Sequence, residues 1–441
     1  MAKDVTFFID CPTLEARMQT LPNVPSVADA SGKRAVQRCD LLGPPPFSDM
    51  PHGLFRAYLS PAYKATVKQV RTWMEEAGMH CRIDAAGNLI GRYEGLVPDA
   101  PALLIGSHLD SVKNAGKYDG MLGVILGIEA VAYFHAQKKR FPFAIEVIGF
   151  GDEEGSRFPV SMLTSRAVAG SLDKLPTIED EKGTSIQQAL QENGLDPAQY
   201  LEAAYKPSQV LAYFEAHIEQ GPVLESLHHA VGLVTSIAAQ YRFQVVMKGM
   251  AGHAGTLPMH LRQDALAAAA EAISCIEKIA QSGPDDLVAT VGQMRVKPGA
   301  PNIVPGWVEF SIDVRAGTES VRNAAAEKIT HALQEISQKR DVDMTLTLQH
   351  DLSASPCNPQ LGAILAASIQ TVTGQPAYSL VSGAGHDAMI MAALAPVCML
   401  FIRCERGISH NPAEAVQDED VETALRVMCD FIQNIPSEKS V

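Results

Sequence analysis

The sequence is short of positive charge and lacks any long apolar run. It carries 36 lysine and arginine residues against 50 aspartate and glutamate residues, a formal net charge of −14. That balance argues against a nucleic-acid or anionic-membrane partner. No stretch approaches the roughly 20 apolar residues that cross a bilayer. We also find no repeat of fixed period and no low-complexity segment. With 46% hydrophobic and 20% charged residues, the composition is that of an ordinary globular protein.

Cysteine is sparse as well, and its spacing argues against a disulfide framework. The eight cysteines are scattered at positions 11, 39, 81, 275, 357, 398, 404 and 429, with no Cys-x-x-Cys pair. In a chain of 441 residues this pattern indicates reduced, mostly buried thiols. The apolar stretch at residues 5–9 is too short, and its surroundings too acidic, for a secretory signal. We therefore expect a cytoplasmic protein.

The length predicts two domains, since one core seldom serves 441 residues. A helix is predicted from Ser60-Pro61 to Gly78, because a serine N-cap, an early proline and a closing glycine frame a periodic stretch. Residues 102–107 and 143–150 form nearly apolar runs, as in strands buried on both faces, and a buried helix at 121–135 separates them. This order predicts a βαβ unit and a mostly parallel sheet, an α/β fold.

The pattern changes between about residues 232 and 352. Strands are predicted at 241–248, 289–295, 307–314 and 343–348, and helices at 261–280 and 321–339. The order β-α-β-β-α-β is that of the split-βαβ sandwich, a compact α+β unit. We expect this unit, at 232–352, to be inserted into a discontinuous domain made of residues 1–231 and 353–441.

Candidate metal ligands follow the predicted strands. His108 and Asp110 follow the first strand, Asp119-Gly120 opens the next helix, and Glu153-Glu154 follows the second strand. In open α/β sheets, ligands bind at the carboxyl ends of the strands. Imidazole with carboxylates suits zinc, manganese or a similar divalent ion, and one carboxylate can bridge two ions. Each piece alone has a plainer interpretation, as a structural histidine or a solvated acidic turn.

Five motifs resemble, in order along the chain, those of the two-metal superfamily of aminoacylases and dipeptidases. They are His108-x-Asp110, Asp119-Gly, Glu153-Glu154-Gly-Ser-Arg-Phe, His217-Ile-Glu-Gln-Gly and Gly407-Ile-Ser-His410-Asn-Pro-Ala-Glu414. Within the superfamily they look like the hydantoinase/carbamoylase branch, which includes allantoate amidohydrolases, N-carbamoyl-L-amino acid hydrolases and β-ureidopropionases. The resemblance runs from about residue 55 to 435.

The resemblance implies a role for each of these residues. Asp119 matches the carboxylate that bridges two ions. His108 and His217 match the other ligands of one ion, and Glu154 and His410 those of the second. Glu153 matches the general base that moves a proton from water to the leaving nitrogen. Asp110 matches the carboxylate that fixes the tautomer of His108, although a turn cap is its plainer interpretation.

The inserted unit resembles the lid and dimerisation domain of the family. His253 matches a lid histidine that stabilises the tetrahedral oxyanion, commonly across a dimer interface. Asn302 and Arg315 match lid segments that bind the substrate carboxylate, a task that suits the planar guanidinium. The remaining matches to substrate-binding positions are Gln220, Gly383, Ala384, Gly385 and His386. For His386, pocket contact and structural support stay equally open.

The expected activity is metal-dependent hydrolysis of a ureido C–N bond in a small carboxylate. Allantoate is the first candidate, on similarity of the segments 253–264 and 401–410 to bacterial allantoate amidohydrolases. N-carbamoyl-L-amino acid hydrolysis, or β-ureidopropionase activity, is the alternative. A dipeptidase or aminoacylase is less favoured, because peptidases of the superfamily place a carboxylate where this chain has His217. A non-catalytic dimeric protein is disfavoured because all five ligand positions and Glu153 are filled. Two divalent ions, zinc or manganese, and a homodimer are implied.

Overall fold

The computed structural model describes residues 30–436, which divide into two compact units. Within that range, the first unit comprises residues 30–234, 357–379 and 386–436, and the second comprises 235–356 and 380–385. The short segment 380–385 thus groups with the second unit, whereas the sequence placed it in the discontinuous domain. Neither unit contains a helix long and apolar enough to cross a membrane.

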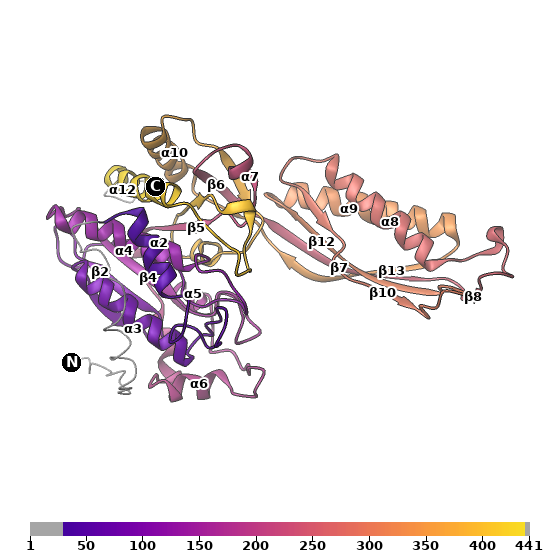
Figure 1. Ribbon diagram of the computed structural model, residues 1–441, viewed down its shortest axis with the longest axis horizontal. Coiled ribbons are helices and arrows are strands. Elements are labelled where there is room, and N and C mark those ends of the chain that lie inside the picture. Colours follow the sequence, from indigo (N-terminus) through magenta and orange to yellow (C-terminus); the bar gives the residue numbers. More distant parts are fainter. Residues whose placement is uncertain (1–29, 437–441) are drawn as a thin grey trace. The chain divides into compact units, whose positions relative to one another are not determined.

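The first unit is built on a mixed sheet with a parallel centre (Figure 1). Four neighbouring strands, in the order β4-β3-β5-β16, run parallel, and the strands flanking them are antiparallel. The strands of this nine-stranded sheet are β1 (His80–Ile83), β2 (Leu89–Tyr93), β3 (Ala102–His108), β4 (Ala144–Phe150), β5 (Val210–Ile218), β6 (Val231–Ile237), β14 (Ser355–Pro356), β15 (Ser379–Ser382) and β16 (Val397–Ile402). Of these, β14 and most of β15 come from segments that group with the second unit. The predicted α/β class with a mostly parallel central sheet is confirmed.

Helix α4 (Met121–Ala136) packs on β3, β4 and β5, and α2 (Gly32–Leu41) and α12 (Asp418–Asn434) pack against α4. Its residues are buried almost all round because it lies between the sheet and this outer layer. Ser60 caps α3 (Pro61–Glu76) as predicted, its hydroxyl accepting from Tyr63 N. The other helices of the unit are α5 (Leu163–Val168), α6 (Ile186–Glu192), α7 (Val223–Ser226), α10 (Pro359–Thr373) and α11 (Asp387–Met391).

The second unit has the predicted β-α-β-β-α-β order. Its antiparallel sheet runs β10-β12-β7-β13, and α8 (Ala265–Gln281) and α9 (Glu319–Arg340) lie together along it (Figure 1). The strands are β7 (Ala239–Lys248), β8 (Gly252–His253), β9 (Val288–Thr290), β10 (Met294–Lys297), β11 (Ile303–Val304), β12 (Trp307–Ala316), β13 (Asp343–Leu352) and β14 (Ser355–Pro356). Alternate residues of β12 are buried, so one face of the sheet supplies the core under the helices.

Two details of the second unit differ from the prediction. The single strand expected at 289–295 is two strands, β9 and β10, because residues 291–293 lie opposite only two residues of β12, 311 and 312, between the two stretches of pairing. Gln293 stays bonded to Ser311, since its carbonyl accepts from the Ser311 N–H and its own N–H donates to the Ser311 hydroxyl. Helix α8 begins at Ala265 rather than Leu261, because the Asp264 carboxylate accepts from the N–H groups of residues 266 and 267 and so caps it.

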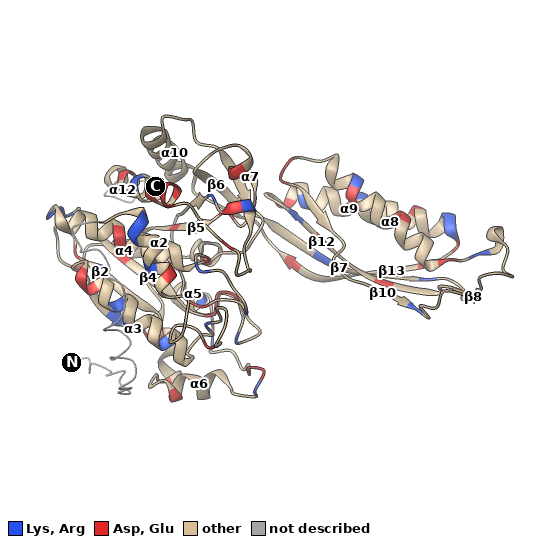
Figure 2. Cartoon of the chain, in the orientation of Figure 1, with Lys and Arg blue, Asp and Glu red and all other residues tan. Residues whose placement is uncertain are grey.

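Helices α8 and α9 both carry charges of either sign (Figure 2). Glu271 of α8 pairs with Lys339 and Arg340 at the end of α9, at 2.7 Å and 2.5 Å. These pairs join the two helices at partly exposed positions. Because they are partly exposed, they contribute little free energy and mainly fix the alignment of the helices.

Candidate metal centre and active site

The candidate ligands of the first unit gather where its parallel strands end. His108 is the last residue of β3, and it pairs in register with Phe150, the last residue of β4. Glu153 and Glu154 follow β4, and His217 is next to last in β5. Parallel strands bring these side chains to one edge of the sheet, as the sequence predicted.

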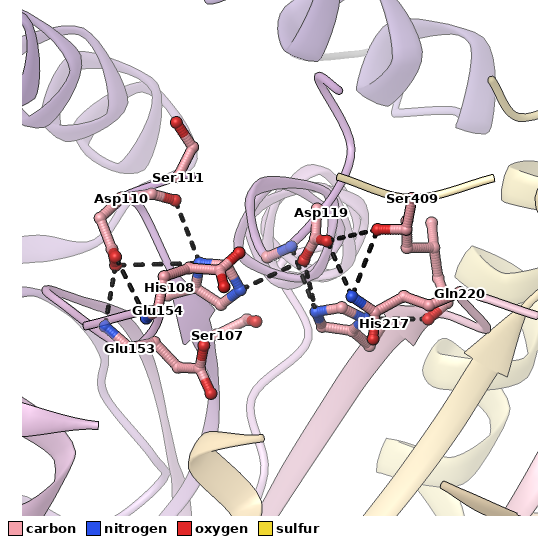
Figure 3. A network of polar contacts seen from close by, with 12 residues as sticks. Ser107, His108, Asp110, Ser111, Asp119, Glu153, Glu154, His217, Gln220 and Ser409 are labelled. Carbon is pink, nitrogen blue, oxygen red and sulfur yellow. Dashed lines mark hydrogen bonds and ion pairs between the residues drawn. The ribbon is translucent and has the colours of Figure 1, made fainter. Parts of the chain in front are cut away.

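Asp119 lies at the centre of this cluster (Figure 3). Its Oδ1 is 3.4 Å from His108 Nε2 and 3.2 Å from His217 Nε2. Its Oδ2 is 3.3 Å from His410 Nε2, which in turn lies 3.2 Å from Glu154 Oε1. The two oxygens of one carboxylate therefore face two different sets of side chains.

Three groups of side chains here have the chemistry of a metal site, with ligand atoms within 4.8 Å of one another. Two of them share Asp119: one is His108, Asp119 and His217, and another is Asp119, Glu154 and His410. The third consists of His108, Glu153 and Glu154. Two ligands that are each about 2.1 Å from a tetrahedral ion are separated by roughly 3.4 Å. The distances around Asp119 match that separation, so the residues fit a divalent ion on either side of this carboxylate.

Hydrogen bonds at the far side of two imidazoles orient them as ligands. His217 Nδ1 lies 2.9 Å from the carbonyl of Ile218, and His108 Nδ1 lies 3.1 Å from the carbonyl of Asp110. A carbonyl only accepts, so each Nδ1 carries a proton. Nε2, which faces Asp119, then holds either a second proton that bonds to that carboxylate or, in the neutral ring, a lone pair for an ion. The neutral ring is the form that a metal ion requires.

The electrostatics of the cluster favour positive charge. Burial opposes protonation of His108, yet the hydrogen bond to Asp119 and the nearby carboxylates raise its pKa well above the usual value. Burial would also raise the pKa of Asp119, but hydrogen bonds from three histidines lower it far below that of a free aspartate. The same carboxylates favour metal cations, which compete with protons for these ligands.

Asp110 fixes the turn that carries the two glutamates. Its Oδ1 and Oδ2 accept from the backbone N–H groups of Glu153 and Glu154, at 3.1 and 3.3 Å. Its carboxylate is 3.8 Å from His108 Nδ1, so the direct hydrogen-bond acceptor of that ring is the Asp110 carbonyl. Glu153 is buried, and burial raises its pKa well above the usual value.

A sequence profile of peptidase family M20/M25/M40 matches residues 104–434. The chain belongs to this family. The family is metal-dependent, and the cluster around Asp119 has side chains that could hold a metal ion.

Relatives with known names are similar to this family member in sequence and in structure. An allantoate deiminase of Arabidopsis thaliana is 39% identical over 430 residues, which cover 91% of this chain and 82% of that protein. An N-carbamoyl-L-amino acid amidohydrolase of Geobacillus stearothermophilus is 41% identical over 360 residues, covering 81% and 88%. The crystal structure of a hydantoinase/carbamoylase family amidase from Burkholderia multivorans matches with a TM-score of 0.84 and 30% identity, covering 93% and 98%. The predicted family resemblance is confirmed.

Two motif residues for which no role was expected contact Asp119 in this M20/M25/M40 family member. Ser409 Oγ lies 2.6 Å from Asp119 Oδ2, and Glu414 accepts from the backbone N–H of Asp119 at 3.2 Å. Gln220, expected near the substrate, donates to the same Oδ2 at 2.8 Å. Gln220 and His410 both have positive φ, at 57° and 54°. Backbone strain of this kind is typical of functional sites.

The segment 42–56, for which the sequence offered no role, supports the loop after β3. Arg56 is fully buried and donates to the carbonyls of Leu42, Phe47 and Leu109, while its own N–H donates to Ser111 Oγ. Burial lowers its pKa to about 10. No local pattern could reveal this contact, because it joins residues more than 50 positions apart.

The second unit brings together four predicted site residues in two pairs, the catalytic candidate His253 with Asn302, and Arg315 with Gly383. Strands β8 and β11 place His253 opposite Ile303, so Asn302 is its near neighbour, and Ala254 N donates to the Asn302 carbonyl at 2.9 Å. Arg315 of β12 donates from Nη1 to the carbonyl of Gly383. His253 is exposed, and the N–H of Gly255 donates to its Nδ1 at 3.1 Å, which puts the proton of the neutral ring on Nε2.

Residues 383–385 of the loop 383–386 are at least partly exposed, whereas His386 is buried. Gly383 and Gly385 are exposed, and Ala384 is half-buried with its N–H donating to Ser382 Oγ at 3.2 Å. His386 belongs to the first unit and is only 2% exposed. Its ring centroid is 4.5 Å from that of His217. Of the two roles left open for His386, structural support for His217 agrees better with this packing.

Proposed function

We propose that this chain is a two-metal amidohydrolase that hydrolyses the ureido C–N bond of allantoate, giving ureidoglycine, ammonia and carbon dioxide. The observation that carries the proposal is the ligand set around Asp119 in a chain 39% identical to an allantoate deiminase over nearly its whole length. Its relatives are hydrolases of C–N bonds, and this chain keeps the side chains that such chemistry needs.

His108, Asp119 and His217 would hold one ion, and Asp119, Glu154 and His410 the other. Bound there, two divalent ions supply the positive charge that polarises a carbonyl and acidifies a water molecule. Zinc and manganese both suit a set of imidazoles and carboxylates.

Glu153 moves the proton in this proposal. As a carboxylate it accepts a proton from the attacking water, and it then delivers that proton to the nitrogen that leaves the carbonyl carbon. Its turn is fixed by Asp110, and burial raises its pKa, which makes it a stronger base than an exposed glutamate.

The second unit supplies the remaining groups. His253 carries its proton on the exposed Nε2, the form that donates to a developing oxyanion. We assign the substrate carboxylate to Arg315, with Asn302 and the backbone of residues 383–385 as further contacts. The unit acts as a lid and dimerisation domain, and His253 completes the site of the neighbouring subunit in a homodimer.

We place the enzyme in the cytoplasm. Of the cysteines between residues 30 and 436, all seven are free thiols, and four of them are buried. Free thiols in that number suit a reducing compartment.

Hydrolysis of N-carbamoyl-L-amino acids is the second candidate, because the Geobacillus stearothermophilus relative is 41% identical. Both substrate classes combine a ureido group with a carboxylate, so the metal ligands do not distinguish them. Ammonia release from allantoate, N-carbamoyl-L-amino acids and β-ureidopropionate, and release of free amino acids from dipeptides, separate these activities when measured on the purified protein with zinc or manganese. The highest kcat/KM is expected for allantoate. Absence of ammonia release from allantoate alongside turnover of a carbamoyl amino acid would overturn the first assignment.

Metal analysis tests the ligand assignment independently of substrate. The protein is expected to bind two divalent ions per chain. His410→Ala is expected to bind one, because His108 and His217 keep the other group intact. A chain that binds no ion after chelation and refilling would contradict the proposal.

A further inference from the structure

Glu414 holds the backbone of the loop that carries Asp119. Its side chain is buried, and Oε1 accepts from the N–H groups of Tyr118 and Asp119, at 2.8 and 3.2 Å. The loop lies so close that a Cβ on Gly116 would approach the Glu414 carboxyl carbon to 2.1 Å. The contact fixes the backbone position from which the Asp119 side chain extends.

The same carboxylate also reaches the side chain of Asp119 through Ser409. Ser409 Oγ lies 2.6 Å from Asp119 Oδ2 and 3.2 Å from Glu414 Oε2. The two oxygens of Glu414 therefore serve different ends of one residue. Oε1 fixes the main chain of Asp119, and Oε2 meets the hydroxyl that contacts its carboxylate.

Glu414 belongs to the loop that presents His410. Asn411 closes a tight turn, because its carbonyl accepts from Glu414 N at 3.0 Å and its side chain accepts from Ala413 N at 2.9 Å. The turn brings Glu414 back beside Ser409, and His410 lies between them in sequence. The loop that carries His410 is thereby bonded to the loop that carries Asp119, although the residues joined are 295 positions apart.

We propose that Glu414 is a positioning residue that couples the two ligand loops of the metal centre, acting on Asp119 directly through its backbone and indirectly through Ser409. The inference rests on the proposed two-metal function. Because Asp119 faces both ligand groups, loss of the coupling weakens the binding of both ions rather than of one.

The chemistry of the contacts predicts which substitutions preserve the coupling. Glutamine at 414 can accept both backbone N–H groups with its oxygen and donate from its amide to Ser409 Oγ, which leaves the hydroxyl proton for Asp119. Alanine removes every contact and leaves two N–H groups without their acceptor. Ser409→Ala removes only the side-chain branch.

Metal affinity of the full-length protein, measured without substrate, tests this coupling. Metal-stripped wild type and variants are titrated with Zn²⁺ against a chromophoric chelator, and with Co²⁺ by its visible absorption spectrum. For Glu414→Ala we expect the affinities for Zn²⁺ and for Co²⁺ each to fall about tenfold or more, the range typical of residues that orient ligands. Ser409→Ala should show a smaller loss, and Glu414→Gln should stay within about threefold of wild type with an unchanged cobalt spectrum.

Glu225→Gln is the matched control, because Glu225 accepts the N–H of Arg406 from the same C-terminal loop at 2.8 Å but contacts no proposed ligand. It should bind ions as wild type does. Wild-type affinity in Glu414→Ala, or an equal loss in Glu414→Gln, overturns the proposal. If Glu414→Ala does not fold, the other two variants test the proposal. A loss of metal affinity in Ser409→Ala with near-wild-type affinity in Glu414→Gln supports it, and any other result overturns it. A wild-type chain that binds no ions refutes the two-metal function itself, a distinct result.

Discussion

The guanidinium of Arg315 is held side-on by the carboxylate of Asp313. Nε lies 2.8 Å from Oδ1, and Nη2 lies 3.1 Å from Oδ2. Nη1 donates to the carbonyl of Gly383. Three of the five N–H groups of an arginine are used in this way, and one on each terminal nitrogen remains. Arg315 is therefore held in place while it keeps donors for a carboxylate ligand.

Asp313→Asn is predicted to raise KM about tenfold for a carboxylate substrate, with kcat changed little. Asparagine presents one oxygen in place of two, and its amide group would face a guanidinium. Loss of one hydrogen bond to a charged group costs about 1.5 kcal/mol, which corresponds to roughly tenfold in affinity. Steady-state kinetics over a range of substrate concentrations measures the effect.

Asp351→Asn is the control for this prediction. Asp351 also pairs with an arginine of the second unit, Arg322, at 2.9 Å, and its side chain is 54% exposed. Its loss should leave KM unchanged. If both variants raise KM equally, the effect belongs to the stability of the unit and not to Arg315.

Glu153→Gln is predicted to lower kcat by about a thousandfold, the scale of general acid–base catalysis, and to leave both ions bound. Glutamine keeps the size of the side chain but takes no proton. The Asp110 carboxylate still accepts the backbone N–H of residue 153, so the turn stays in place. Turnover assays and metal analysis are made on the same samples. Glu154→Gln is the comparison, and it should lose metal. Retained turnover in Glu153→Gln would remove this residue from the mechanism.

Position along buried strands explains why part of the site could be predicted from the sequence. His108 and the Glu153–Glu154 pair follow apolar runs whose ends must meet at one sheet edge. Asp119 precedes a buried helix that starts at that edge. The local sequence pattern predicts such positions, but it does not indicate which of these residues would share a metal ion. The family resemblance supplied the ligand sets, and the structure places the side chains of both sets around Asp119.

Contacts between distant residues explain what the sequence could not provide. Glu414 and Arg56 stabilise the ligand loops through backbone groups, which carry no side-chain signature. The burial of His386 against His217 follows from packing in three dimensions. The break between β9 and β10 comes from one extra residue opposite β12, the strand with which both pair. In each case the deciding partner lies far along the chain or in a neighbouring strand.

His217→Asp is predicted to slow carbamoyl hydrolysis at least about tenfold while ions still bind. The carboxylate adds negative charge beside Asp119 and should make the metal pair less electrophilic. It also cannot donate to the carbonyl of Ile218, which His217 Nδ1 contacts at 2.9 Å. The rate and the metal affinity are measured together. His331→Asp makes the same substitution at an exposed position of α9, and it should change neither. Wild-type turnover with both ions bound contradicts the proposed role of His217 in setting electrophilicity.

Glu129→Gln is predicted to destabilise the first unit by about 3 kcal/mol, because it removes the counterion of two buried arginines. Glu129 of α4 is fully buried and lies 2.7 Å from Arg34 Nη2 and 2.7 Å from Arg38 Nη1, both on α2. Thermal unfolding followed by circular dichroism measures the loss. Glu75→Gln is the matched control, since the exposed pair of Glu75 with Arg71 at 2.8 Å should contribute about 0.5 kcal/mol or less.

The position of this ion pair gives the prediction a second readout. Helix α4 starts two residues after Asp119, and α2 covers its outer side through Glu129. Release of α2 in Glu129→Gln should therefore expose the segment 30–56 to protease before the rest of the first unit unfolds. Arg56 belongs to that segment and holds the loop after β3, so metal affinity should fall as α2 detaches. Equal unfolding midpoints for Glu129→Gln and Glu75→Gln would show that α2 contributes no stability through this carboxylate.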